Sequence, residues 1–473
     1  MLKKFPATFW IANVVELFER WAWYGMFMIL ALYLTGAPET GALGFSQAQK
    51  GILMGTVVGI LYFLPVFTGS IADNLGYKKS LLIALFIYFT GYVLLSVVKS
   101  FFLFYLAFLY LAVGSALFKP IVSATVQKTT TKETVSVGFG LFYMIVNIGA
   151  FLGPIFSSKL REMGWGYVFY MAAFLSALNF LMVLLFYKEP AKQVKEKIHL
   201  AELFGKVFGN FAQVLKDKRL LIFLLLIVSF WTIYNQLFFA LPVYISQWVS
   251  TVPLYDFLHS LWPSFADAVG HNGHIEPEMI TNLDAGFIIL FQVLVSSAVK
   301  RFYPVKTIMS GIFVATLGIT LAFITSNIFW LIAGIFVFSI GEMTSSPKVT
   351  EYIASIAPPD KTALYVGTSF IPLSLGNFFA GIISGNVYQA VADKITFMRK
   401  ELIGLGYDVQ EVKNMSETML SQTLCEIKGL NPNTLTEWLW DKYHPYDYWI
   451  LLFSIGMFAV VSLWIYYTKL IKK

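Results

Sequence analysis

Three ionisable residues stand together in the first long apolar run of the chain, in the stretch VVELFERWAWYG at residues 14–25. The run over residues 5–34 carries no other charge. Glu16, Glu19 and Arg20 are spaced i, i+3 and i+4, so on a helix they share one face. Two carboxylates beside one guanidinium leave one acid without a full partner, and such an acid is suited to taking up and releasing a proton. An ion pair that only holds helices together is the alternative.

Two further charges interrupt apolar runs. Lys119 stands in GSALFKPIVSATV with about half a helical span on either side, which disfavours a snorkelling side chain, so we expect a carboxylate partner on the first run. Glu342 stands in FSIGEMTSSPKVTEY, in the second half of the chain. If Lys119 and Arg20 face Glu342, the space between them suits a zwitterion with a carboxylate at one end and an ammonium at the other. Pairing of Glu342 with Lys348, or capping of a kink near Pro347, is the alternative.

The composition indicates the kind of protein that holds these charges. The chain has 473 residues, of which 58% are hydrophobic and 13% charged, whereas soluble domains are about 25% charged. Apolar runs of the length that crosses a bilayer, about 20 residues, recur from end to end. We therefore expect an all-α polytopic membrane protein. Its twelve spans are predicted at residues 8–34, 51–72, 79–98, 101–127, 136–159, 165–187, 220–248, 285–301, 305–325, 328–357, 363–391 and 447–468.

A Lys-rich, partly amphipathic stretch divides the spans into six and six. It predicts a six-helix bundle over 1–187, a linker over 188–219 and a second bundle over 220–473, with insertions at about 250–283 and 392–446. Lys and Arg gather in the loops on the linker's side, while residues 250–284 contain neither. By the positive-inside rule both termini and the linker are cytoplasmic, and the insertions face outward.

Several classes of partner and cofactor are not expected. The single cysteine, Cys425, excludes an internal disulfide and a cysteine-built metal site. No Gly-rich phosphate loop is present, so we do not expect ATP to drive the protein. We expect a proton gradient as the energy source and no enzymatic activity. Basic loops fit anionic membrane lipid, not nucleic acid. The outer histidines, His259, His271 and His274, are more consistent with an exposed loop than with a metal site. We expect a monomer.

Twelve spans in two halves are typical of the major facilitator fold, with its site between the halves at mid-membrane depth. Within that fold, ELFER resembles the ExxER motif of the proton-dependent oligopeptide transporter family. GSIADNLGYKKS is similar to the superfamily's cytoplasmic gate motif, and ALFKP to the peptide-transporter family's fourth-helix lysine segment. GFGLFYMIVNIGAFLGP and IGEMTSSPKVTEYIASIAP resemble that family's fifth- and tenth-helix signatures. The resemblance implies a proton-coupled symporter that imports di- and tripeptides by alternating access.

The resemblance also implies roles for single residues. Proton coupling would fall to Glu16, Glu19, Arg20 and Lys119. Substrate binding would fall to Arg20, Tyr24, Tyr62, Lys119, Asn147, Asn235, Glu342 and Ser346. Within these, Arg20 and Lys119 would attract the peptide carboxylate and Glu342 would receive the amino group. The gate motif supplies Gly69, Asp73, Gly76 and Lys78.

The second half of the chain departs from the family's pattern. Asn235 stands where the family usually has an acidic residue, and Asp284 and Ala285 stand where it usually has Asn-Pro. Ser369 stands near a position at which a tryptophan is common in the family. We expect Asp284 at the outer end of its span, in contact with water. Two other functions stay open: transport of another small zwitterion or organic anion, and a sensor or scaffold that does not transport.

Overall fold

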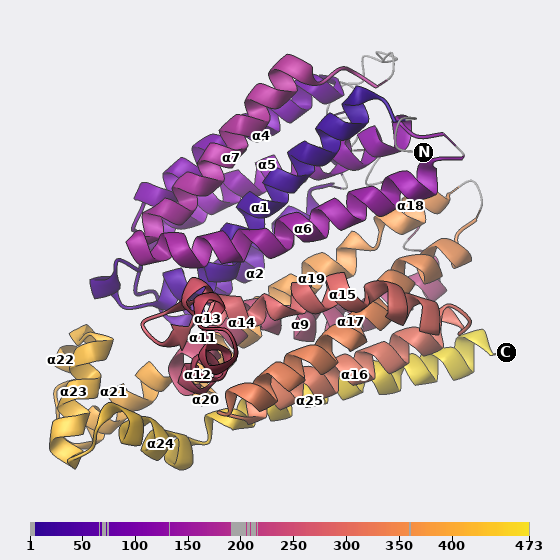
Figure 1. Ribbon diagram of the computed structural model, residues 1–473. Helices are drawn as coiled ribbons and strands as arrows, with labels where there is room; N and C mark the ends of the chain where they lie inside the picture. The colour runs from indigo at the N-terminus through magenta and orange to yellow at the C-terminus, as the bar shows by residue number, and fades with distance from the viewer. Residues whose placement is uncertain are drawn as a thin grey trace.

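The computed structural model describes residues 5–65, 67–68, 72, 75–131, 133–190, 205, 209, 214, 216–358 and 361–472. The helices of the first half of the chain form one bundle and those of the second half another, with both termini at one end (Figure 1). We call this the termini end and the opposite one the insertion end. Most of the predicted linker lies outside the described residues, as do Gly69 and Asp73 of the gate motif.

The first bundle is built on α1, which packs against α5, α6 and α7. Pro6 precedes α1, and Gly36 follows it. Ser46 and Gln49 form a capping box at the start of α2, which satisfies two backbone donors of its first turn. The helices of this bundle are α1 (Ala7–Thr35), η2 (Pro38–Thr40), α2 (Gln47–Phe63), α4 (Tyr77–Val97), α5 (Phe101–Lys128), α6 (Val135–Met163) and α7 (Trp165–Phe186).

The second bundle contains broken helices. Its first span is interrupted at Asn235 and Ala240, which divide it into three pieces. The helices are α9 (Lys218–Tyr234), α10 (Gln236–Phe239), α11 (Leu241–Trp248), α15 (Leu283–Val299), α16 (Pro304–Ile324), α17 (Ile328–Ile356), α18 (Thr362–Gly367), α19 (Phe370–Ile382), η3 (Ile383–Val387), α20 (Tyr388–Val391), α25 (Tyr448–Tyr466) and η5 (Tyr467–Ile471).

Ten helical segments in the described part of the chain are long and apolar enough to cross a membrane. Neither α1 nor α2 is among them, because α1 carries three charges and α2 has only 17 residues. Both nevertheless pack inside the bundles. The expected all-helical membrane fold is confirmed.

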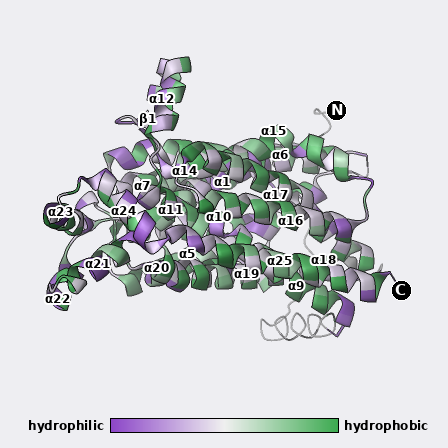
Figure 2. Ribbon diagram, turned by 90° about the horizontal axis from the view of Figure 1, so that it is seen from below, coloured by the Kyte–Doolittle hydropathy of each residue, from purple (hydrophilic) through white to green (hydrophobic). Residues whose placement is uncertain are grey.

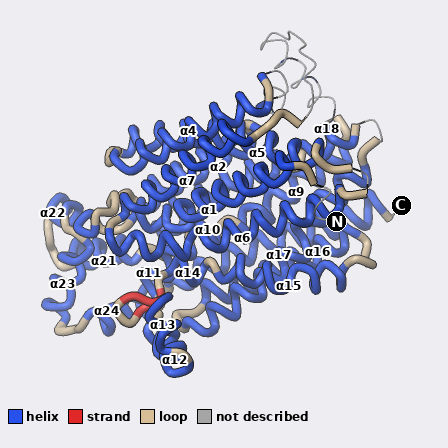
Figure 3. The backbone as a smooth tube through the Cα atoms, turned by 45° about the horizontal axis from the view of Figure 1, so that its top comes forward, coloured by secondary structure: helices blue, strands red, loops and turns tan. Residues whose placement is uncertain are grey.

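Two insertions extend from the second bundle at the insertion end. The first stands out from the side of the bundle (Figure 2), and its two short antiparallel strands lie near α11 and α14 (Figure 3). It comprises α12 (Val252–Leu261), α13 (Pro263–Val269), β1 (Gly270–His271), β2 (His274–Ile275) and α14 (Pro277–Thr281). The second comprises α21 (Lys394–Gly404), α22 (Val409–Asn414), α23 (Glu417–Lys428), α24 (Pro432–Tyr443) and η4 (Pro445–Asp447).

The bundles are closed against each other at the insertion end. The α2 helix packs on α19 and η3. Gln47 of the first bundle donates to the carboxylate of Asp393 at 3.1 Å, and the Arg161 guanidinium pairs with Glu276 and Glu278 of the second bundle.

Candidate functional site

The charges of α1 form one buried cluster. Arg20 Nε lies 3.3 Å from Glu16 Oε1, and the guanidinium is also hydrogen-bonded to Glu19. All three residues are buried, with exposed fractions of 6% for Glu16, 3% for Glu19 and 6% for Arg20. Since the guanidinium is a rigid fork of donors, one arginine can hold both carboxylates at once. The structure therefore brings together the three residues that the i, i+3, i+4 spacing places on one face.

A tyrosine that the sequence did not indicate completes the cluster. The Tyr88 hydroxyl of α4 donates to Glu19 Oε1 at 2.5 Å, so each oxygen of Glu19 has its own donor. The Tyr88 ring stacks on Tyr92 one turn later, with centroids 5.9 Å apart. The Tyr88 hydroxyl gave no signal in the sequence, because Thr90 and Tyr92 carry hydroxyls in the same apolar run and nothing in the sequence distinguishes one from the others.

Lys119 does not make the ion pair that we expected. Its ammonium lies 4.2 Å from the centre of the Tyr62 ring, a cation–π contact, and in the described part of the chain no carboxylate lies within 4 Å of it. The reason is that Arg20 already holds both carboxylates of α1. The prediction of a direct Lys119–Glu16 or Lys119–Glu19 bridge is therefore wrong, although all of these groups remain in electrostatic contact.

The second bundle brings two carboxyls together. Glu342 of α17 lies beside Asp284 of α15 and Tyr234 at the end of α9. The Ser339 hydroxyl donates to Asp284 Oδ1 at 2.5 Å, and Asp284 is only 4% exposed. Our expectation that water reaches Asp284 is wrong, because α15 packs its first turn against α17. Sequence reasoning also missed Tyr234, the neighbour of Asn235.

Glu342 is not paired with the nearby lysine. Lys348 instead pairs with Glu351, with Nζ and Oε2 2.7 Å apart, so the alternative of a Glu342–Lys348 pair is wrong. One carboxylate oxygen of Glu342 is buried with no hydrogen-bond donor among the described residues. This acid therefore has an acceptor available for a donor from outside the chain.

Aromatic residues of the first bundle face this acid. Tyr24 of α1 and Tyr143 of α6 are both in electrostatic contact with Glu342, and Tyr24 also lies near Arg20. Tyr24 thus stands between Arg20 of the first bundle and Glu342 of the second. The carboxyls, the guanidinium and these rings define one site at the interface of the bundles.

Three other predicted residues, Asn147, Ser346 and Asn235, lie in or at the end of helices that carry residues of this site. Asn147 donates to the carbonyl of Tyr143, one turn away on α6. Ser346 follows Glu342 by one turn on α17. Asn235 caps α9 and donates to the Trp231 carbonyl.

The described residues of the gate motif lie at the termini end. Gly76 has a φ of 98° at the start of α4, where a side chain would be strained. The Lys78 ammonium donates to the carbonyl of Leu184, and its backbone N–H donates to Glu189. Both contacts remain inside the first bundle.

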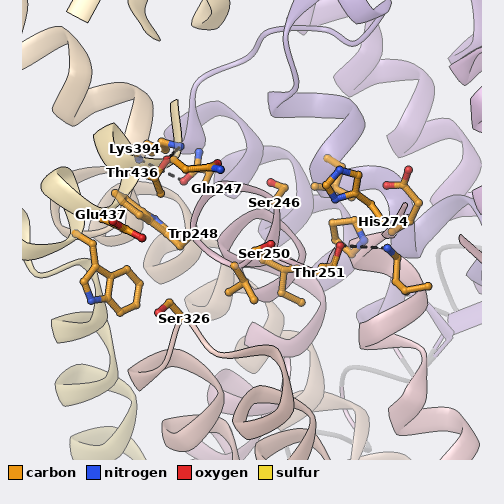
Figure 4. A pocket seen from close by; sticks show the side chains of 18 of the residues that line it. Ser246, Gln247, Trp248, Ser250, Thr251, His274, Ser326, Lys394, Thr436 and Glu437 are labelled. Atoms are coloured by element: carbon orange, nitrogen blue, oxygen red, sulfur yellow. Dashed lines mark hydrogen bonds between the residues drawn. The ribbon is translucent and has the colours of Figure 1, made fainter. Parts of the chain in front are cut away.

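A separate pocket of about 1010 Å³ opens at the insertion end (Figure 4). Its walls come from the end of α11, the β1–β2 hairpin and one face of α24. Lys394 donates to Thr436 across one side of the pocket, at 2.7 Å. Gln247 in its wall donates to Asp393, which also accepts from Gln47 of the first bundle. The pocket thus adjoins the closed contact between the bundles.

The outer histidines do not converge on one another. His271 lies 3.2 Å from Glu162, while His259 stacks on Tyr255. Among the described residues, no group of three or more histidine, cysteine or acidic side chains is arranged to hold a metal ion.

The family profile of the Major Facilitator Superfamily matches residues 10–252. The chain belongs to this superfamily. It is therefore a secondary transporter and not an enzyme. This assignment agrees with two helical bundles that enclose a buried charged site at their interface.

The relatives bear out the resemblance to the oligopeptide transporters. A peptide transporter of Yersinia enterocolitica is 23% identical over 442 residues, covering 79% of this chain and 86% of that protein. A dipeptide and tripeptide permease A of Citrobacter koseri is also 23% identical, covering 83% of this chain and 86% of the permease. The crystal structure of a POT family transporter in complex with 5-aminolevulinic acid superposes with a TM-score of 0.72 at 17% identity, covering 98% and 96% of the two chains. That likeness shows the shared fold.

Proposed function

We propose that this transporter is a proton-coupled symporter that imports di- and tripeptides by alternating access. The observation that carries the proposal is the buried cluster of Glu16, Glu19 and Arg20, whose charges face Glu342 across the interface of the bundles. Buried ionisable groups in membrane helices are costly, and they mark ion or proton pathways.

The proton step rests on competition for Arg20. While both carboxylates are ionised, the guanidinium is held by Glu16 and Glu19. When Glu16 or Glu19 takes up a proton it loses its charge, and the attraction that holds Arg20 weakens. The guanidinium is then free to bind the carboxylate of a substrate. After release of the substrate, the proton leaves and the ion pair forms again.

The substrate would lie between the two bundles. Its carboxylate would approach Arg20 and Lys119, whose ammonium has the Tyr62 ring as its one close partner among the described residues. Its ammonium would approach Asp284 and Glu342, one of whose carboxylate oxygens accepts no hydrogen bond from the described residues. Contacts with the peptide backbone would come from Tyr24, Tyr62, Asn147, Asn235 and Ser346. This arrangement selects a zwitterion with a length that spans the two sites.

The second bundle takes part in proton handling through its carboxyl pair. Two carboxyls side by side repel each other when both are ionised, so Asp284 and Glu342 are suited to share one proton. An acid at the position of Asn235 is therefore not the only means by which this bundle could be coupled to protons. The arriving ammonium of a substrate would displace the shared proton.

Other small zwitterions form the second candidate class of substrate. One structure of the same fold holds 5-aminolevulinic acid, which carries an ammonium and a carboxylate on a single short chain. The same opposed charges would receive such a molecule here. A sensor that does not transport has no evident use for the Glu16–Glu19–Arg20 cluster.

We further propose the cytoplasmic membrane as the location, with the termini end in the cytoplasm and a monomer as the working unit. The Lys and Arg residues near the termini end, among them Lys78 and Lys469, support this orientation. Membrane lipid and small peptides would be the partners.

Uptake into proteoliposomes under an inward proton gradient tests the proposal. A labelled dipeptide should accumulate, while a single amino acid and an organic anion should not. Equal accumulation of the amino acid would favour the second class of substrate, and no accumulation of any compound would contradict symport.

Blocked peptides test the polarity of binding. A charge-assisted contact contributes about 1.5–3 kcal/mol, so amidation of the carboxylate or acetylation of the amine should weaken binding by roughly ten- to a hundred-fold. Lys119→Ala should abolish the discrimination against amidated peptides, and Glu342→Ala the discrimination against acetylated ones. Equal binding of blocked and free peptides by the wild type would show that the opposed charges do not select the substrate.

A further inference from the structure

The first insertion is folded, and hydrogen bonds and side-chain packing hold its helices and strands together. Its helices α12 and α13 project sideways from the bundle at the insertion end, across the direction of the spanning helices (Figures 2 and 3). The N–H of Ile275 donates to the Thr251 hydroxyl at 3.1 Å, which fixes the start of the insertion against β2. The Tyr255 hydroxyl donates to Asp267 at 2.7 Å and joins α12 to α13. Gly270 allows the Tyr255 ring to pack, since a Cβ there would lie 2.6 Å from it.

One face of α12 is apolar. Leu254, Phe257, Leu258 and Leu261 are spaced i, i+3, i+4 and i+7, which places them on one side of the helix. Leu254 and Leu258 are half-buried against the protein, whereas Phe257 is 51% and Leu261 69% exposed. The helix thus covers only part of its apolar face with its own chain.

The same surface continues into α13, and the other side of α12 is polar. Trp262 is 64% exposed and stacks on Phe265, with ring centroids 5.4 Å apart. Asp256, His259 and Ser260 occupy the opposite side of α12 and are exposed. The unit is therefore amphipathic, with large aromatic and aliphatic side chains on one side only.

The apolar face lies level with the end of a spanning helix. The Phe257 ring meets the Phe329 ring edge to face, with centroids 5.9 Å apart. Phe329 belongs to the first turn of α17, which begins at Ile328, and its neighbour Trp330 is 62% exposed. The ends of spanning helices lie at the membrane–water interface, where tryptophan and tyrosine are enriched. The exposed face of α12 is thus continuous with the lipid-facing surface of α17.

We infer that the α12–α13 unit lies in the lipid interface at the insertion end, with Phe257, Leu261 and Trp262 inserted between the lipids. Amphipathic helices of this kind bind through buried apolar area and through attraction to anionic headgroups. Residues 250–284 contain no Lys or Arg, so the apolar area alone provides the binding. Zwitterionic lipid is therefore sufficient. The unit anchors the connection between α11 and α15, and this inference is independent of the substrate.

Two adjacent probe positions test this inference. Cys425→Ser removes the only cysteine, and Leu261→Cys or Ser260→Cys then introduces one thiol on the apolar or the polar side. Each thiol receives an environment-sensitive nitrobenzoxadiazole fluorophore, and the protein is placed in nanodiscs of phosphatidylcholine. Elution as a single symmetric peak shows that each variant is folded. Quenching is then measured with iodide in the water and with a doxyl group attached near the lipid headgroup.

We expect the probe at position 261 to emit at a shorter wavelength than the probe at position 260. It should be quenched by the doxyl lipid and protected from iodide, and the probe at position 260 should show the reverse. Two probes equally open to iodide would overturn the inference. Protection of position 261 from both quenchers would also overturn it, since a second copy or another segment would then cover the face. A requirement for anionic lipid would contradict the charge argument.

Discussion

Adding one methyl group at Gly51 is expected to open the insertion end of the transporter. Gly51 and Gly55 of α2 face Gly381 of α19 and Gly385 of η3, and the backbones of the two bundles touch there. A Cβ at Gly51 would lie 2.2 Å from the carbonyl oxygen of Gly381 and 2.6 Å from the Cα of Gly385. Both atoms belong to the backbone, so no side chain can move aside to make room.

The size of the effect follows from these contacts. Ordinary contact begins at 3.4 Å, so α2 and α19 must separate by about 1 Å to accept the methyl group of Gly51→Ala. Overpacking of a close interface costs about 1–3 kcal/mol. The alanine raises the free energy of the closed arrangement alone, because the helices separate when this end opens. The population of the open form relative to the closed form should therefore rise about 5- to 150-fold.

Electron–electron distance measurements can detect this shift. Spin labels at Glu39→Cys and Ser326→Cys, in a Cys425→Ser background, report the separation of the bundles at the insertion end. Gly51→Ala should increase the fraction of long distances, and uptake should slow because the closed form is reached less often. Gly140→Ala is the control, since among the described residues no atom outside the local helix backbone lies within 4 Å of a Cβ added on that turn of α6. Identical distance distributions for Gly51→Ala and the wild type would refute the reasoning.

Four other substitutions probe the closed end and the proton site. Lys50 is fully buried, with its ammonium 5.3 Å from the Tyr388 ring and no hydrogen-bond acceptor among the described residues. Lys50→Met removes the free-energy cost of burying that charge when the bundles close, so the same spin-label distances should shorten. Longer distances would contradict this. Glu19→Gln should abolish accumulation driven by the proton gradient while sparing exchange of labelled for unlabelled substrate, and full accumulation would exclude the proposed proton step. Asp284→Asn removes one of two paired acids and should change the dependence of uptake on external pH, whereas an unchanged profile would place the pair outside the proton path. Asn235→Glu should alter that profile more than it alters substrate affinity at fixed pH, and a change in affinity alone would assign this position to substrate binding.

The part of the site that lies on one helix was predictable from the sequence. The spacing of Glu16, Glu19 and Arg20 fixes their common face, because the pitch of an α-helix is constant. The contacts of Lys119 with Tyr62 and of Tyr88 with Glu19 depend on how neighbouring helices rotate and approach, which no spacing along one helix records. The side-chain pair of Asp284 and Glu342 was missed for the same reason.

The fold was predictable to a similar extent. Apolar runs long enough to cross a bilayer identify the spanning helices, since every backbone polar group in lipid must be bonded within a helix. The break at Asn235 was not anticipated, because no proline or glycine lies near it in the apolar run over residues 220–248. The break at Ala240 had a signal in Pro242, two residues later, which our prediction of one continuous span did not use. The glycines at positions 51 and 381 had no recognised role until the closed end showed their contact.

Proton movement that accompanies peptide entry tests the central claim most directly. Wild-type protein is placed in liposomes that contain a pH-sensitive dye, with equal pH on both sides and a dipeptide gradient directed inward. Symport predicts that the lumen becomes more acidic as the dipeptide enters, and that Glu19→Gln abolishes this acidification. Entry of the dipeptide into wild-type vesicles without any change in luminal pH would contradict proton coupling.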